Sequence, residues 1–152
     1  MVFKISEKDW KIIKLLKMNG RMSDAEIARR LKISKTAVRW RRQKLQEKGI
    51  LEIVAIVKFD KAKIPYAFVL LKLKPEVNKK DVLKFINTLL NEERVYEICE
   101  VAGTYDLKVG IFGSTLDEIF DVVNSLFRGN PIVQTMDILM GVKYWKAFEK
   151  PV

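Results

Sequence analysis

The sequence predicts an α+β protein with an N-terminal helix-turn-helix domain, winged-helix-like in type, and a C-terminal ferredoxin-like β-α-β-β-α-β domain. Apolar residues recur at helical spacing over the first 50 positions, and strand-like alternation and β-branched runs follow. The formal charge of +10 lies wholly in residues 1–51, which hold 15 Lys and Arg against 5 Asp and Glu, whereas residues 52–152 hold 14 of each. A basic block that ends with the helical pattern indicates a separate module with a polyanionic partner.

Three helices are expected in the N-terminal domain, residues 1–50. Ser6 can cap the first helix, with Asp9 as the reciprocal acid of a capping box. Ser23 and Ser34 can cap the second and third helices, which a turn of about three residues separates. The helices are expected to cover residues 6–18, 23–31 and 34–48.

A hinge strand over 51–59 is expected next, within a linker that spans 51–65, and residues 66–152 form the second domain. In that domain the order strand-helix-strand-strand-helix-strand is the ferredoxin-like order. The helix faces that carry Phe85, Leu89, Phe120 and Phe127 are expected to pack on the sheet, and Cys99 is expected to be a buried thiol. Strands are expected at 66–74, 95–101, 107–112 and 133–140, helices at 79–91 and 115–128, and the stretch 142–148 could add an edge strand.

Composition excludes several classes of site. The chain has no histidine and a single cysteine, so no Ser-His or Cys-His pair, imidazole ligand or multi-cysteine zinc motif can form. We therefore expect no catalytic residue, metal or cofactor. No run of 18 apolar residues could span a membrane, and the N-terminal residues lack a signal peptide, so we expect a cytoplasmic protein.

The third helix concentrates basic residues and predicts contact with double-stranded DNA. In helix-turn-helix proteins the first turns of this helix meet base edges, while flanking basic side chains hold phosphates. The second helix adds arginines where a clamp on the phosphate backbone would lie. The predicted DNA-binding residues are Arg29, Arg30, Ser34, Lys35, Thr36, Arg39, Arg41 and Arg42.

Two residues of the third helix leave alternatives open. Arg42 falls on the stripe of Val38 and Leu45, where an apolar residue is expected, so either its side chain extends to a phosphate or the helix is rotated from this placement. Trp40 is either a core or interface aromatic or a residue that stacks on bases. A solvated basic face on a helical bundle is the simpler alternative for the whole surface, but it explains neither the turn length nor the caps.

Three segments carry a family resemblance: Asp9–Leu16, Ser34–Arg39 and Leu45–Leu51. Together they resemble the Lrp/AsnC family of feast/famine transcriptional regulators. The chain departs from the family pattern at Lys32, where the family usually has glycine, and at Arg42, where it usually has an apolar residue. The resemblance covers essentially the whole chain. It implies a sequence-specific regulator that forms homodimers through its sheet, assembles further into tetramers or octamers, and binds a small amino-acid effector.

The resemblance also implies effector-binding residues. The family's Gly-x-x-Asp motif is matched by Gly103, Tyr105 and Asp106, and its Thr-x-Thr element by Thr135 and Asp137, with aspartate at the second position. From the residues alone, Gly103 and Asp106 equally suit a plain β-turn. If a pocket exists, its two aspartates favour a cationic ligand such as lysine or arginine.

Two rival functions stay open. The basic module could bind chromatin-type DNA or RNA without sequence preference. The chain also resembles siroheme decarboxylases, but those enzymes are thought to use histidines, and the absence of histidine here disfavours that activity.

Overall fold

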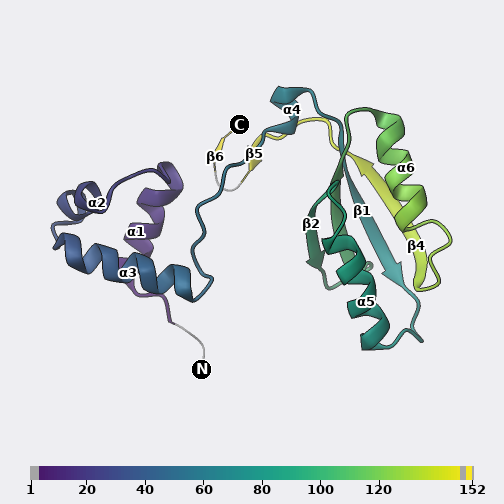
Figure 1. The fold of residues 1–152 in the computed structure, drawn as a ribbon, viewed down its shortest axis with the longest axis horizontal. Coiled ribbons are helices and arrows are strands. Elements are labelled where there is room, and N and C mark those ends of the chain that lie inside the picture. Colours follow the sequence, from purple (N-terminus) through teal and green to yellow (C-terminus); the bar gives the residue numbers. More distant parts are fainter. Residues whose placement is uncertain (1–3, 148–149, 152) are drawn as a thin grey trace. The chain divides into compact units, whose positions relative to one another are not determined.

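The computed structural model describes residues 4–147 and 150–151, which fold as two compact units (Figure 1). One unit contains the described residues up to Ile56 and a small two-stranded sheet from the C-terminal end, and the other runs from Val57 to Trp145. The first is helical and the second combines a sheet with helices, so the expected α+β class is confirmed.

The N-terminal unit is a three-helix bundle in which a serine precedes each helix. The side chains of Ser6, Ser23 and Ser34 accept hydrogen bonds from backbone N–H groups three residues later, at 3.2, 3.2 and 3.1 Å. The helices are α1 (Glu7–Met18), α2 (Asp24–Leu31) and α3 (Lys35–Glu47). Their apolar faces form one core, whose buried members are Ile12, Ile13, Leu16, Met22, Ile27, Ala28, Val38, Leu45 and Leu51.

The turn between α2 and α3 places a lysine in the left-handed conformation. Lys32 has φ 53° and ψ 46°, and its N–H donates to the carbonyl of Ala28. A side chain in this region costs roughly 1–2 kcal/mol relative to the right-handed helix, which is why glycine is common there. Lys32 therefore adopts a conformation that glycine usually supplies in such a turn, at the cost of local strain.

The expected hinge strand over 51–59 is not formed in the single chain. Residues 51–58 have no regular secondary structure, and the short helix α4 (Phe59–Ala62) follows. Leu51 is buried in the core of the N-terminal unit, but the apolar side chains after it are exposed, among them Val54 at 68% and Val57 at 61%. A strand needs a neighbouring strand for its backbone hydrogen bonds, and the sequence pattern cannot supply that neighbour.

The second unit has the expected ferredoxin-like order. Its sheet is antiparallel with strand order β2-β3-β1-β4. Sequential strands β1 and β2 are thus separated by β3, as two split β-α-β units require. The elements are β1 (Tyr66–Leu73), α5 (Lys79–Leu90), β2 (Val95–Glu100), β3 (Leu107–Phe112), α6 (Leu116–Leu126) and β4 (Val133–Met140).

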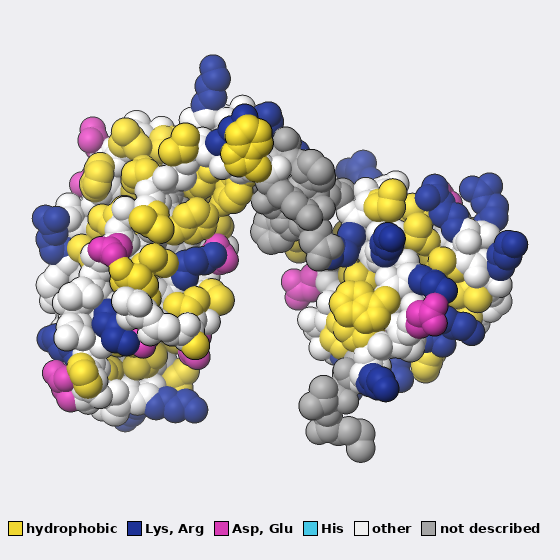
Figure 2. All heavy atoms as spheres, turned by 180° about the vertical axis from the view of Figure 1, so that it is seen from behind, with side chains coloured by type: hydrophobic (Ala, Val, Ile, Leu, Met, Phe, Trp, Pro, Cys, Tyr) yellow, Lys and Arg dark blue, Asp and Glu magenta, His cyan; other side chains and the backbone are white. Residues whose placement is uncertain are grey.

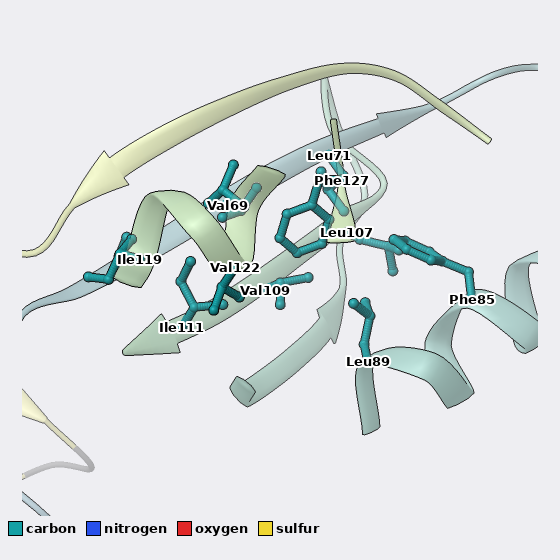
Figure 3. Packing of buried hydrophobic residues seen from close by; sticks show 12 residues of the cluster. Val69, Leu71, Phe85, Leu89, Leu107, Val109, Ile111, Ile119, Val122 and Phe127 are labelled. Carbon is teal, nitrogen blue, oxygen red and sulfur yellow. The ribbon is translucent and has the colours of Figure 1, made fainter. Parts of the chain in front are cut away.

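Both long helices cover one face of this sheet, and Figure 3 shows their side chains meeting those of β1 and β3. Phe85 and Leu89 from α5 and Phe127 at the end of α6 are buried there, as expected. The aromatic rings of Phe85 and Phe127 meet edge to face, with centroids 6.2 Å apart. The rest of the core consists of Ala67, Val69, Leu71, Leu107, Val109, Ile111, Ile119, Val122 and Val123.

Three expectations for this unit are corrected. Phe120 is 46% exposed, because its neighbour Ile119 occupies the direction toward the sheet. Cys99 is exposed on β2, a strand at the sheet edge. The stretch 142–148 does not extend the four-stranded sheet: β5 (Lys146–Ala147) pairs only with β6 (Lys150–Pro151), and residue 148 lies outside the described residues.

The face of the sheet opposite α5 and α6 is called the open face below. Alternation along β1 places Phe68, Leu70 and Lys72 on it, since Val69 and Leu71 point into the core. In register, Phe68 lies opposite Leu139 of β4 and Leu70 lies opposite Asp137.

Aromatic rings cover one end of the open face. Phe59 of α4 stacks on Phe112 with centroids 5.2 Å apart, and Tyr144 stacks on Tyr66 at 5.0 Å. Leu139, further along, remains 51% exposed. The open face therefore has one end that aromatic rings cover. It also has an apolar row, formed by Phe68, Leu70 and Leu139, that α5 and α6 do not cover.

Candidate nucleic-acid interface and ligand pocket

The basic side chains of the N-terminal unit gather on its surface, where Figure 2 shows dark blue side chains in excess over magenta ones. Over the first two turns of α3, Ser34, Lys35, Thr36 and Arg39 are all exposed. The first N–H groups of a helix and its dipole favour anions such as phosphate. This end of α3 can therefore approach a polyanion with hydrogen-bonding side chains in front.

Two further predicted residues lie at the end of α2. Arg29 and Arg30 are both exposed. Arg30 Nη2 lies 2.6 Å from Glu26 Oε1, one helical turn away on the surface. An exposed pair of this kind contributes little to stability, so the guanidinium can exchange it for a phosphate.

Arg41 and Arg42 are placed differently from the expectation. Nη1 of Arg41 lies 2.9 Å from Oδ1 of Asp9 on α1 and also donates to Ser6. Nη1 of Arg42 lies 3.0 Å from Oδ1 of Asp24, the first residue of α2. Their side chains are only 24% and 30% exposed. The structure thus gives both arginines internal ion pairs, and we leave them out of the DNA surface proposed below.

Helix geometry explains this placement. Positions 41 and 42 flank the direction of Val38 and Leu45, which are 0% and 1% exposed. The helix is therefore not rotated, and an arginine is accommodated at the semi-buried position 42 because Asp24 lies beside it. The sequence showed the stripe but not the carboxylate that partners each arginine.

Sequence reasoning did not include Trp40 and Gln43 among the DNA-binding residues, although both are exposed on α3. They follow Thr36 at intervals of four and three residues, which places all three on one face of a helix. That spacing is visible in the sequence, but its outward direction becomes known only once the buried side of α3 is known.

In the second unit, the loop between β2 and β3 is attached to β1 through Asp106. One carboxylate oxygen accepts the backbone N–H of Leu73 at 2.8 Å, and the other accepts Lys72 Nζ at 3.1 Å. These two contacts hold the pKa of Asp106 below its ordinary value, although desolvation opposes them. Asp106 is thus already paired with a cation, and Lys72 is a partner that sequence reasoning could not find 34 residues away.

Contacts bring most of the other predicted effector residues to the same place. The Tyr105 hydroxyl donates to Asp137 on β4, and this hydrogen bond raises the pKa of Tyr105. Thr135 lies opposite Lys72 in the register of β1 and β4. Gly103 has φ 149°, a backbone conformation that side chains disfavour, so glycine shapes the loop.

An open hollow of about 500 Å³ lies beside this loop. Of the five predicted effector residues only Asp106 lines it. Its walls carry two lysines, two acids and apolar side chains, so their formal charges balance. The lining residues are Lys72, Leu73, Lys74, Pro75, Val82, Glu100, Val101, Asp106 and Leu107.

Metal clusters and membrane-spanning helices are both absent from the described residues. No cluster of three or more Cys, Asp or Glu side chains there could hold a metal ion. No helix in the same part of the chain is long and apolar enough to cross a membrane.

Known proteins share both the sequence and the fold. A family profile described as winged helix-turn-helix DNA-binding matches residues 5–52. An uncharacterized HTH-type transcriptional regulator of Pyrococcus horikoshii, PH1055, is 47% identical over 97% of this chain and 93% of its own length. The structure of Escherichia coli AsnC superimposes with a TM-score of 0.72 at 21% identity, covering 93% of this chain and 95% of AsnC. The chain is a transcriptional regulator of the Lrp/AsnC family.

The fold of this Lrp/AsnC regulator also matches a transcriptional regulator from Neisseria meningitidis solved as a complex with L-Met. The TM-score is 0.78 at 19% identity, and the alignment covers 95% of this chain and 94% of the other. The helix-turn-helix domain gives the regulator a DNA partner.

Proposed function

We propose that this regulator binds specific DNA sequences through the N-terminal half of α3, that it acts in the cytoplasm as a homo-oligomer rather than as an enzyme, and that an amino acid modulates it. The observation that supports DNA specificity is the exposed set on the first two turns of α3. Thr36 and Arg39 are residue types that hydrogen-bond to base edges, whereas Lys35 carries a point charge suited to phosphate. Arg29 and Arg30 add phosphate contacts from α2.

Arg39→Ala tests this proposal. A pool of duplexes with a random central segment is first enriched on the wild-type protein, and affinities for the enriched and a scrambled duplex are then measured by fluorescence anisotropy. If Arg39 contacts a base, the variant loses roughly 1–3 kcal/mol of binding free energy with the enriched duplex and less with the scrambled one. Affinity should also fall steeply with salt, because phosphate contacts release counterions.

Arg128→Ala is the matched control. Arg128 is an exposed arginine of the other unit, so its substitution removes the same charge as Arg39→Ala. It should leave the affinity for the enriched duplex unchanged. If no sequence is enriched and all duplexes bind equally, the rival proposal of a chromatin-type or RNA-binding protein replaces this one.

The homodimer proposal rests on two surfaces of the chain. The apolar row of the open face, with Phe68, Leu70 and Leu139, is covered by neither α5 nor α6. Residues 51–57 carry exposed β-branched side chains without a strand partner in the described chain. A second copy would cover the first surface and can offer an identical strand to the second. Two recognition helices about 34 Å apart would then meet a pseudo-palindromic site.

Further assembly of dimers into tetramers or octamers is proposed from the outer surfaces of α5 and α6. Leu83 and Leu90 on α5 and Leu116 and Phe120 on α6 are 46–68% exposed. Exposed apolar side chains on the outer surfaces of neighbouring helices are typical of a contact surface.

The effector proposal rests on the hollow beside Asp106. Its balanced lining of two lysines and two acids suits the ammonium and carboxylate of a free amino acid, and its apolar walls suit a side chain. The complex of the Neisseria regulator with L-Met supports the same ligand class. The pocket favours lysine or arginine less than its aspartates suggest, because Lys72 neutralises Asp106.

Calorimetry against the twenty amino acids tests this proposal. We expect at least one to bind, and Glu100→Gln to weaken its binding by about tenfold, since Glu100 lines the hollow and would meet the ammonium. Glu93→Gln, an exposed acid outside the hollow, is the control and should bind normally. Heat signals for none of the twenty, or equal binding by both variants, would contradict the proposed site.

A further inference from the structure

We propose that Trp40 contacts DNA directly and selects thymine at one position of each half-site, through apolar contact between its indole ring and the C5-methyl group in the major groove. The inference rests on the proposed sequence-specific binding and adds a specificity-determining residue to it.

Trp40 lies outside the core of its unit. Its side chain is 57% exposed, and the buried cluster formed by α1, α2 and α3 does not include it. Two basic side chains of the same helix lie near the ring: Lys44 Nζ is 4.8 Å from its centroid and the guanidinium carbon of Arg41 is 6.0 Å away. These cations hold the indole at the surface, where its apolar area is available to a partner. The same cations would attract a partner that is anionic.

The direction of the ring is set by what is buried on the opposite side. Val38 and Leu45 face the core, and the ion pairs of Arg41 and Arg42 occupy the two flanks. At about 100° per residue, Trp40 is about 200° from Val38 around the helix axis, so it points away from the core. Thr36, one turn earlier, and Gln43, one turn later, share this direction and are exposed.

The exposed row formed by Thr36, Trp40 and Gln43 has a basic end and an acidic end. Lys35 and Arg39 flank it near the N-terminus of α3, whereas Gln43 Nε2 donates to Glu47 Oε1 at 3.0 Å near the C-terminus. A carboxylate repels DNA phosphates, so the contact with the duplex runs from the N-terminus of α3 to about Gln43. Trp40 lies within that stretch.

The chemistry of the indole selects the base. Its only polar group is one N–H donor, and the rest of its surface is apolar. Among the base edges in the major groove, thymine alone presents a methyl group, and apolar side chains recognise thymine by contact with it. A tryptophan directed into the groove therefore favours thymine over the other three bases.

Substitution of uracil for thymine tests the contact on the enriched duplex. Uracil lacks only the C5-methyl group, so each thymine of a half-site is replaced in turn and affinity is measured by anisotropy. We expect one replacement to weaken wild-type binding by about fourfold, the effect of one buried methyl group, and to have no effect on Trp40→Ala. Trp40→Ala should itself bind the thymine duplex at least tenfold more weakly than wild type and the scrambled duplex nearly as well.

The outcomes separate this inference from the proposed function. If a sequence is enriched but contains no thymine in its half-sites, or if uracil weakens wild type and Trp40→Ala equally, the Trp40 inference is overturned and sequence-specific binding stands. If no sequence is enriched, both fail.

Fluorescence gives a second test with the native side chain in place. The chain has three tryptophans, at 10, 40 and 145, so Trp10→Phe with Trp145→Phe leaves Trp40 as the sole indole. Its emission should become protected from acrylamide on addition of the enriched duplex. The matched variant, Trp40→Phe with Trp145→Phe, leaves the exposed Trp10 as the reporter. At duplex concentrations that saturate this variant in the anisotropy assay, it should show no protection; equal protection of both would overturn the inference.

Discussion

Replacing Asp9 by alanine is expected to destabilise the N-terminal unit by about 3 kcal/mol. Asp9 is 6% exposed and completes the capping box of α1 with Ser6, whose backbone N–H and hydroxyl both donate to it. It also accepts a hydrogen bond from the Arg41 guanidinium. Loss of a cap costs about 1 kcal/mol, and a semi-buried arginine left without its partner adds about 2 more. Urea denaturation followed by far-UV circular dichroism measures the loss.

Glu7→Ala is the matched control, because Glu7 lies in the same helical turn but is exposed and pairs with Lys11 on the surface. It should cost less than about 0.5 kcal/mol. A similar loss for the two variants would show that the Asp9–Arg41 pair contributes nothing of its own.

The same pair predicts how the difference in unfolding free energy between wild type and Asp9→Ala changes with pH. Burial alone would raise the pKa of Asp9, but the hydrogen bonds from Ser6 and Arg41 outweigh it and hold the pKa below the ordinary value. A group whose pKa is lower in the folded state stabilises the fold above its unfolded pKa, about 3.9, and loses that effect as pH falls through its folded pKa. The stability difference should therefore be constant from pH 7 to about pH 5 and shrink below about pH 4.

The second large effect is expected at the open face, where Leu139→Glu should dissociate the proposed homodimer. Leu139 is 51% exposed in the single chain, so a charge there is tolerated by the monomer. If a second copy covers the open face, each dimer would bury two unpaired carboxylates, which costs several kcal/mol. We expect the dimer dissociation constant to rise at least a hundredfold, measured by sedimentation equilibrium over a range of concentrations.

Leu90→Glu provides the control on the opposite side of the sheet. Leu90 is 68% exposed on α5 and faces away from the sheet, so this variant should keep the dimer. Dissociation by Leu90→Glu with an intact Leu139→Glu dimer would move the interface to the helices and contradict the proposal for the open face.

The helices were predictable because their signals are local. Ser6, Ser23 and Ser34 cap the three N-terminal helices where the sequence places them, since a cap depends on a side chain and an N–H three residues away. The strands of the second unit were also found, as alternation between buried and exposed positions is a property of each strand alone. The order of elements then predicted the ferredoxin-like sheet.

What the sequence could not predict concerns partners that are distant in sequence. The segment 51–58 has the composition of a strand, but a strand forms only beside another strand. Arg41 and Arg42 have the composition of DNA contacts, but Asp9 and Asp24 lie close enough to pair with them. The sequence predicts Phe120 in the core, but its side chain is exposed. A sequence shows the width of a helix's apolar stripe, but not which of its residues reach the sheet.

For the candidate sites, the sequence by itself determined the class of partner. The concentration of charge in residues 1–51 and the turn between two capped helices are compositional and local, and they are enough to indicate duplex DNA. Only the tertiary structure showed which basic side chains are exposed and which are paired within the chain, and it directed Trp40 outward and Arg41 inward. It also brought Lys72 to Asp106. The reason is physical: a charge is counted residue by residue, but its direction and its neutralisation depend on which other helix or strand packs against it.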